Sequence, residues 1–210
     1  FNKNGTIVVP TFSYSFTKKE DYNKFTTPSD IGDFSNYFWK SKKVKRSNNP
    51  IFSVASIGKY SEEFSNSRID DCFGRDTAFD LLYRLNGKII CLGCEFNRIT
   101  FVHYVEQKYN VQYRYFKNFS GNIYLNNKPV YINTSYYVRN LKINSDCDLD
   151  KLKDECFKKK KLYSIPIGRF NLLAINAKNF YKIAWGLLKK DKSSLIVKKK
   201  NEYKIWPYWY

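Results

Sequence analysis

The chain has 210 residues, 43% of them hydrophobic, which suits one domain with its own core. No run approaches the ~20 apolar residues of a membrane-spanning helix, and the first residues lack the basic-then-apolar order of a secretory signal. The net charge of +18, from 37 Lys and Arg against 19 Asp and Glu, favours anionic partners.

The first half of the chain predicts alternating strands and helices. GTIVVPTFSYSF, at 5–16, is rich in β-branched residues and is interrupted at Pro10, which predicts a short buried strand that leads into a loop. We expect a helix after Pro50, in NPIFSVASIGKYSEEF, and another at 75–85, where apolar residues recur at helical spacing. IICLGC then predicts a second buried strand, and 99–110 a further helix.

This order of elements implies crossover connections. It predicts an α/β fold, a three-layer αβα sandwich with a mixed, largely parallel central sheet, followed by C-terminal antiparallel strands. After residue 110, VQYRYFKNF and GNIYLNNKPVYI alternate between polar and apolar residues, as antiparallel strands do, and 148–161 and 176–191 predict helices. We expect a single domain over 1–210, with a motif-bearing α/β part at 1–110 and the strands and C-terminal helices at 111–210.

The cysteines predict reduced thiols and therefore a cytoplasmic protein. There are five of them, an odd number without the spacing of a disulfide framework. CLGC at 91–94 has CxxC spacing but stands alone, whereas structural zinc normally takes four ligands. We therefore expect no metal site and interpret Cys91 and Cys94 as buried strand residues.

The only histidine of the chain, His103, precedes Glu106 by three residues. On a helix these positions share a face, so the imidazole and the carboxylate can point into the same space. A histidine with a pKa near ~6.5 suits proton transfer at neutral pH. The spacing alone leaves two interpretations open, a catalytic base with its partner or a surface histidine with an incidental neighbour.

Three stretches together resemble the motifs of the aminoglycoside 3-N-acetyltransferase family. They are GTIVVPTFSYSF, VKRSNNPIFSVASIGK and NGKIICLGCEFNRITFVHYVEQ, in the order and spacing of the family, and a looser match follows in SIPIGRFNLLAINAKNFYKIAWGLLKKDKSSL. The matching residues are Gly5, Thr6, Pro10, Thr11, Arg46, Ser47, Pro50, Ser53, Gly58, Leu92, Gly93, Thr100, His103 and Glu106. The resemblance covers most of the chain.

The chain departs from the family pattern in two places. The family carries a further strand-and-helix segment before the first motif, and we expect this chain to lack it, which bears on its activity. Asn49 stands where the family commonly has a histidine before the proline, so a role for position 49 stays open.

The resemblance implies an acetyl-CoA-dependent N-acetyltransferase that acts by direct transfer to a primary amine, without an acyl-enzyme. It implies that His103 is the general base and that Glu106 fixes its tautomer, a pair that contributes ~10²–10⁴-fold to the rate. Thr100 is implied as an oxyanion or substrate contact, with helix capping as the alternative. The implied coenzyme-binding residues are Pro10, Thr11, Arg46, Ser47 and Ser53. Capping and turn roles stay open for them.

The charge bears on the acceptor amine. Aminoglycosides are polycations, and a chain of charge +18 repels them, although screening beyond ~8–10 Å weakens the effect. We therefore expect a nucleotide-linked amino sugar, as in similar enzymes of surface-polysaccharide assembly, with an aminoglycoside as the alternative. The expected partners are coenzyme A and an amine-bearing sugar, and an oligomer is compatible with the sequence.

Two interpretations come from other classes. Aromatic residues make up 19% of the chain and interleave with basic ones in QYRYFKNF, which suits nucleic-acid stacking, but no recognised nucleic-acid motif appears. The C-terminal tail suits peripheral attachment to a membrane, which is compatible with catalysis. That tail combines Lys198–Lys200 with Trp206, Tyr208, Trp209 and Tyr210.

Overall fold

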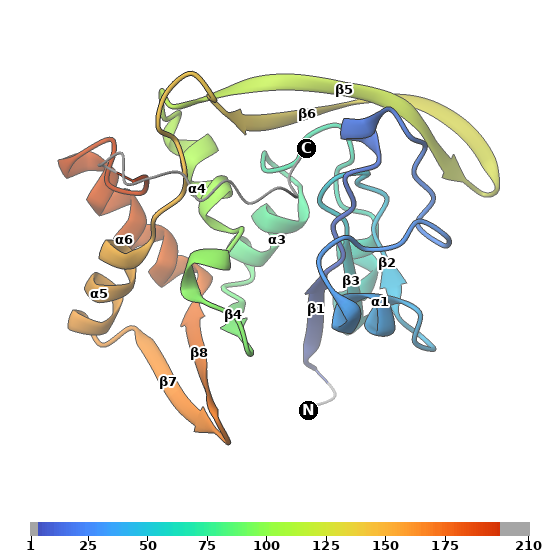
Figure 1. Ribbon diagram of the computed structural model, residues 1–210. Coiled ribbons are helices and arrows are strands. Elements are labelled where there is room, and N and C mark those ends of the chain that lie inside the picture. The colour runs from blue at the N-terminus through green and yellow to red at the C-terminus, as the bar shows by residue number, and fades with distance from the viewer. Residues whose placement is uncertain (1–3, 198–210) are drawn as a thin grey trace. The chain divides into compact units, whose positions relative to one another are not determined.

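The computed structural model describes residues 4–197, which divide into two compact units (Figure 1). The first unit comprises residues 4–81 and 116–136, and the second comprises 82–115 and 137–197. Within the described range, no helix is both long and apolar enough to cross a membrane.

The first unit is built around a small antiparallel sheet. Its elements are β1 (Thr6–Pro10), η1 (Phe16–Lys18), α1 (Asp33–Trp39), β2 (Lys45–Arg46), β3 (Val54–Gly58) and α2 (Ser61–Ser65). The strand order is β1-β3-β2, and Thr6 pairs with Gly58 where β1 and β3 meet at one end. Gly58 has φ +117°, and a Cβ there would lie 2.1 Å from the carbonyl oxygen of Gly5, so this close approach requires glycine.

Aromatic rings fill the core of the first unit. The ring centroid of Phe52 lies 4.9 Å from that of Phe12, 4.7 Å from that of Phe73 and 4.9 Å from that of Tyr136. Phe73 in turn lies 5.0 Å from Phe79 at the start of α3 (Ala78–Arg84). Several of these pairs are tilted or edge-on, the arrangements in which aromatic rings attract one another.

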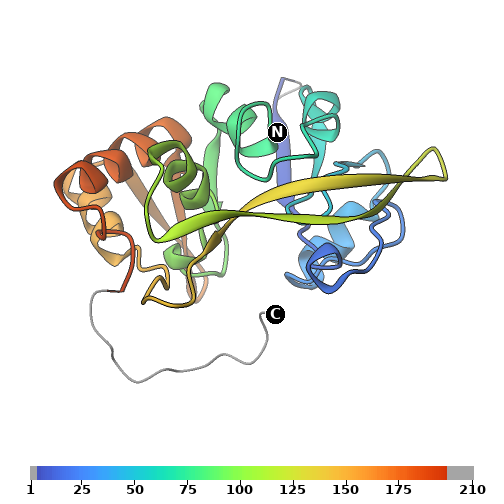
Figure 2. The same cartoon turned by 90° about the horizontal axis from the view of Figure 1, so that it is seen from above.

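Two long strands, β5 (Arg114–Leu125) and β6 (Lys128–Arg139), form a twisted hairpin (Figure 2). Asn126 and Asn127 connect them with φ of 50° and 61°, the left-handed backbone of a two-residue type I′ turn. Tyr22 ties the hairpin to the first unit, because its N–H donates to the Asn122 carbonyl at 2.9 Å.

The second unit combines a three-stranded sheet with helices. Its elements are the end of α3, β4 (Lys88–Cys91), η2 (Phe96–Arg98), α4 (Val102–Tyr109), α5 (Asp150–Lys158), β7 (Leu162–Ile167), β8 (Phe170–Asn176) and α6 (Ala177–Lys190). The strand order is β4-β8-β7, with antiparallel neighbours.

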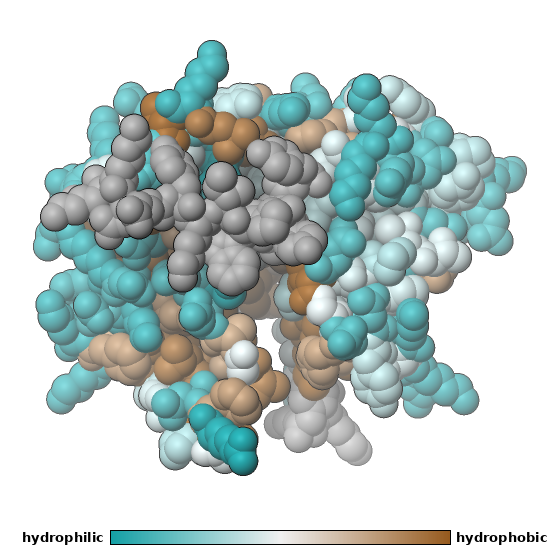
Figure 3. Space-filling model, in the orientation of Figure 1, coloured by the Kyte–Doolittle hydropathy of each residue, from teal (hydrophilic) through white to brown (hydrophobic). Residues whose placement is uncertain are grey.

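The two faces of this sheet differ. Ile175 is 1% exposed and pairs with Ile89 and Leu162 on the face that packs with α5 and α6. On the opposite face Ile165 is 53% and Tyr163 60% exposed. Apolar side chains consequently gather on the surface over β4, β7 and β8 (Figure 3).

The predicted helices at 75–85, 99–110, 148–161 and 176–191 are confirmed as α3, α4, α5 and α6. The strands expected at the start of GTIVVPTFSYSF and in IICLGC are confirmed as β1 and β4. The long amphipathic helices and the β-branched runs are therefore the elements that local sequence predicts.

The largely parallel central sheet is not confirmed, because β1 and β4 lie in different small sheets whose ladders are antiparallel. The helix expected after Pro50 is wrong: Val54–Gly58 is the central strand β3, and only Ser61–Ser65 is helical. Val54, Ala55 and Ser56 are all buried, so this strand lacks the alternation that separates strands from helices.

Replacing Ile175 with Ala should lower the free energy of unfolding by ~2–5 kcal/mol, since it removes buried methyl groups and leaves a cavity. Ile165→Ala on the exposed face is the matched control and should change it by less than ~0.5 kcal/mol. Urea titration of both variants measures the difference. Equal losses would contradict the assignment of the two faces.

Candidate active site

Helix α4 places His103 and Glu106 on one face. The imidazole Nδ1 of His103 lies 2.7 Å from Oε2 of Glu106. The Glu106 side chain is 0% exposed and the His103 side chain 17% exposed. The predicted pair is therefore formed, with the carboxylate inside and the imidazole at the edge of the protein.

The chain after α4 returns to the same carboxylate. Asn110 ends the helix with φ 60°, a left-handed conformation that asparagine tolerates, and turns the backbone. Tyr113 then donates its hydroxyl proton to Oε1 of Glu106 at 2.9 Å. Arg114 forms an ion pair with the same carboxylate, Nε to Oε2 at 2.6 Å, and its side chain is 4% exposed.

These contacts determine the charge states of Glu106 and His103. Burial alone would raise the pKa of Glu106, but Arg114, His103 and the Tyr113 hydroxyl outweigh it and hold that pKa below its usual value. Burial lowers the pKa of His103, and the nearby Arg114 charge lowers it further, against the opposing influence of Glu106. At neutral pH the site thus holds an ionised Glu106 and a neutral His103.

This arrangement fixes the tautomer of the imidazole. An ionised carboxylate accepts hydrogen bonds only, so Nδ1 of His103 carries the proton that it donates to Glu106. The lone pair then resides on Nε2, as in a base oriented by a carboxylate. The site is chemically suited to take a proton at Nε2 and to stabilise the resulting imidazolium.

Thr100 lies one turn before His103. The His103 backbone N–H donates to the Thr100 carbonyl at 3.0 Å, and the residue that caps α4 is Phe101. The capping role considered for Thr100 is therefore wrong. Its half-buried side chain remains close in sequence to the imidazole.

A second polar cluster lies in the first unit, around the buried guanidinium of Arg46. Its Nε donates to the hydroxyls of Thr11 at 3.1 Å and Ser53 at 3.2 Å, and its Nη2 donates to the Thr11 carbonyl at 2.7 Å. Nη1 donates to the Thr27 carbonyl at 2.5 Å, and the Trp39 ring lies 4.8 Å away. Arg46 is 5% exposed, so its N–H groups donate to acceptors inside the protein and not to solvent.

The neighbours of Arg46 complete this cluster. Ser47 is fully buried and its hydroxyl accepts the Val54 N–H at 3.0 Å. Pro10, at the end of β1, is exposed. Asn49 caps a turn, because its side-chain oxygen accepts the Phe52 N–H at 2.7 Å. The substitution at position 49 therefore has a local structural role.

The structure thus brings the predicted residues together in two groups, one in each unit. His103 and Glu106 meet in the second unit, and Thr11, Arg46 and Ser53 meet in the first, whereas the Ser47 hydroxyl bonds to the Val54 N–H. The sequence did not identify Tyr113 and Arg114 as partners of Glu106. They belong to QYRYFKNF, where the alternation indicates only a strand, and they come after the end of α4, so their contact with Glu106 depends on the turn at Asn110 and not on helical spacing.

Three other expectations concern partners. Tyr113 and Arg114 face Glu106, so this part of QYRYFKNF is not presented to nucleic acid.

Among residues 4–197, no three His, Cys, Asp or Glu side chains are grouped to hold a metal ion. The tail proposed to contact a membrane, Lys198–Lys200 and the aromatic residues after it, lies outside the described residues.

Comparison with known proteins gives one family and one fold. A model of the family described as aminoglycoside 3-N-acetyltransferase matches residues 1–189. The apoenzyme of aminoglycoside acetyltransferase AAC(3)-IVa is similar with 22% identity and a TM-score of 0.73, over 92% of this chain and 72% of that chain.

Two further solved structures share the fold. AAC-IIIb in a binary complex with CoASH has 15% identity and a TM-score of 0.77, over 90% of this chain and 79% of that chain. The YokD protein from Bacillus subtilis has 21% identity and a TM-score of 0.69, over 88% of this chain and 78% of that chain.

Because His103 is the only histidine, its proton resonance can be titrated without assignment. We expect its pKa below the ordinary ~6.5. Glu106→Gln should lower that pKa further, since it removes the charge that favours the imidazolium. Glu95→Gln, an exposed carboxylate, should leave it unchanged. A rise in the Glu106→Gln protein would contradict this electrostatic picture.

Arg46→Lys should lower the free energy of unfolding by at least ~2 kcal/mol, because lysine cannot replace the donors to the Thr11 and Thr27 carbonyls, and buried acceptors without partners are costly. Arg68→Lys, at an exposed ion pair with Asp70, is the matched control with an effect below ~1 kcal/mol. Thermal and urea unfolding measure both. An Arg46→Lys protein as stable as the wild type would refute the structural role.

Proposed function

The chain belongs to the aminoglycoside 3-N-acetyltransferase family, whose members are coenzyme A-dependent N-acetyltransferases. From this premise we propose that it moves an acetyl group from acetyl-CoA to a primary amine of an amino sugar, with His103 as the general base. The observation that carries the proposal is the neutral His103 held by the buried carboxylate of Glu106.

The proposed transfer proceeds without an acyl-enzyme. Nε2 of His103 takes a proton from the amine while the amine nitrogen attacks the thioester carbonyl. Glu106 stabilises the imidazolium that forms, and Thr100 donates a hydrogen bond to the oxyanion of the tetrahedral intermediate. The C–S bond then breaks, and the coenzyme thiolate leaves and takes up the proton from His103.

We propose that Pro10, Thr11, Arg46, Ser47 and Ser53 serve coenzyme binding in different ways. Pro10 is exposed and is available for contact, whereas the other four are at most 5% exposed. The hydrogen bonds among Thr11, Arg46 and Ser53 hold the end of β1 in place, and Ser47 bonds to Val54 of β3. In this hypothesis the buried residues position the contact surface, and the 210 residues act as one acetyltransferase domain in the cytoplasm.

Charge supports an anionic acceptor, for which an amino sugar linked to a nucleoside diphosphate is our preferred candidate. The residues of the second unit that the structure describes include nineteen Lys and Arg against eight Asp and Glu. Such an excess attracts phosphates to the unit that carries His103 and repels polycations.

Aminoglycosides are the second candidate. Family membership favours them, and solved relatives are described in complex with a gentamicin, with apramycin and with sisomicin. The two candidates differ in the sign of the acceptor charge, which makes them separable by experiment.

His103→Gln should reduce kcat/KM for acetyl transfer by ~10²–10⁴-fold, because the base is lost. Calorimetry should show unchanged affinity for coenzyme A. Glu106→Gln should reduce kcat/KM as well, and the double variant should be no slower than His103→Gln alone, since the two groups act as a unit. Unaltered turnover in His103→Gln protein would overturn the proposal.

The acceptor is tested by comparing a nucleotide-linked amino sugar with sisomicin while sodium chloride rises from ~0.05 to ~0.5 M, which shortens the screening length. We expect the higher kcat/KM for the nucleotide-linked sugar and a fall of that value with salt. The opposite result, efficient acetylation of sisomicin and none of the anionic sugar, would select the aminoglycoside function.

A further inference from the structure

The end of β4 brings two cysteines together. Cys91 is the last residue of the strand, and Gly93, with φ 67°, bends the chain so that Cys94 follows three residues later on the adjoining loop. The expectation that both are buried strand cysteines is therefore wrong for Cys94, which is exposed on the loop after the strand.

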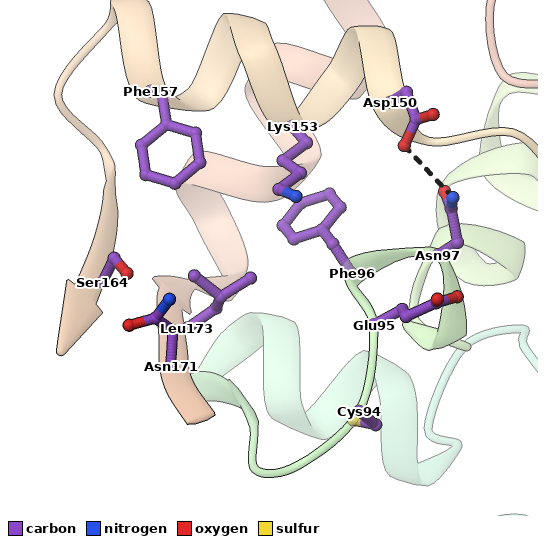
Figure 4. A pocket seen from close by; sticks show the side chains of 10 residues that line it. All are labelled: Cys94, Glu95, Phe96, Asn97, Asp150, Lys153, Phe157, Ser164, Asn171 and Leu173. Carbon is purple, nitrogen blue, oxygen red and sulfur yellow. Dashed lines mark hydrogen bonds between the residues drawn. The ribbon is translucent and has the colours of Figure 1, made fainter. Parts of the chain in front are cut away.

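The two thiols differ in accessibility. Cys91 is 3% exposed, whereas Cys94 lines a pocket of about 500 Å³ between η2, α5 and the β7–β8 strands (Figure 4). Glu95 and Lys153 also line this pocket. A small molecule can thus approach the Cys94 sulfur and not the Cys91 sulfur.

The surroundings of Cys94 favour its thiolate. The pKa of Cys94 is lowered to about 6, first by a hydrogen bond with Cys91 and then by the Leu92 backbone and the Arg98 charge. Burial and the Glu95 charge act in the opposite direction and raise it. The pKa of Cys91 is raised, first by its hydrogen bond to Cys94 and then by burial, while Lys153 of α5 opposes the rise. One thiol is therefore a nucleophile at neutral pH and the other a protonated partner.

From this geometry we propose that Cys94 is a site of reversible S-thiolation, with Cys91 as the resolving thiol. The reactant is a low-molecular-weight disulfide, whose small size suits the pocket beside Cys94. The end product is an intramolecular disulfide between Cys91 and Cys94. This chemistry is independent of acetyl transfer.

The reaction proceeds in two exchanges. The Cys94 thiolate attacks one sulfur of the disulfide, whose S–S bond breaks, and the departing thiolate takes a proton from water. Cys91 then loses its proton to solvent and attacks the Cys94 sulfur, which expels the second small thiol. The two protein thiols are oxidised by two electrons, and the small disulfide is reduced to two thiols.

The first exchange prepares the second. The largest cause that raises the pKa of Cys91 is its hydrogen bond to the Cys94 thiolate. Once Cys94 carries a mixed disulfide, this charge is gone and the pKa of Cys91 falls. Closure of the disulfide then needs the Cys91 and Cys94 sulfurs to approach to ~2.05 Å.

The remaining cysteines serve as internal controls. Burial raises the pKa of Cys156 to about 12 and also raises the pKa of Cys72 and of Cys147. Cys72 and Cys156 are buried and Cys147 is half-buried. These thiols should react far more slowly than Cys94.

The test treats the reduced full-length chain with oxidised glutathione at pH 7 and measures intact mass and peptide maps. Wild-type protein should lose the mass of two hydrogen atoms and yield a peptide linking Cys91 to Cys94. Cys91→Ala should stop at one glutathionyl group on Cys94. Cys156→Ala, the buried control, should behave as wild type.

A second readout is the pH dependence of alkylation by a limiting amount of iodoacetamide. The labelling rate of Cys94 should reach its half-maximum near pH 6, and Cys91→Ala should move this midpoint upward. Labelling spread evenly over the five cysteines, or a stable glutathionyl adduct on Cys94 of the wild type, would overturn the proposal.

Discussion

The buried carboxylate of Glu106 is the group on which the polar interior of the second unit depends. Leaving such a charge without a partner would cost ~3–5 kcal/mol, so the surrounding chain is arranged to supply partners. Helix α4 supplies His103 from one turn earlier, and the left-handed Asn110 sends the backbone back so that Tyr113 and Arg114 reach the same two oxygens. The start of the long hairpin is thereby fixed by an electrostatic requirement.

The same ion pair determines what His103 can do. Arg114 keeps Glu106 ionised, and its positive charge, added to the effect of burial, disfavours a second cation on the imidazole. Glu106 opposes this by attracting the imidazolium. The resting base is consequently neutral, while its protonated form finds a carboxylate 2.7 Å away. This balance matches the requirement of a base that must accept a proton and release it within one catalytic cycle.

Local sequence predicted much of the architecture and the central pair of the site. Helical spacing identified α4 and the contact between His103 and Glu106, because both depend on residues three apart. It could not find Arg114, since that contact depends on how the chain turns after α4. The strand β3 was mistaken for a helix because burial of Val54, Ala55 and Ser56 erases the alternation of a strand. The exposure of Cys94 depends on a bend at Gly93 that the CxxC spacing leaves undetermined.

The ¹⁵N chemical shifts of His103 at neutral pH test the central claim most directly, because they report which ring nitrogen holds the proton. The account predicts a protonated Nδ1 and an unprotonated Nε2, with the Nδ1 proton shared with Glu106. A proton on Nε2 alone, or a fully protonated ring at pH 7, would contradict it, since neither form presents the lone pair that the proposed transfer uses.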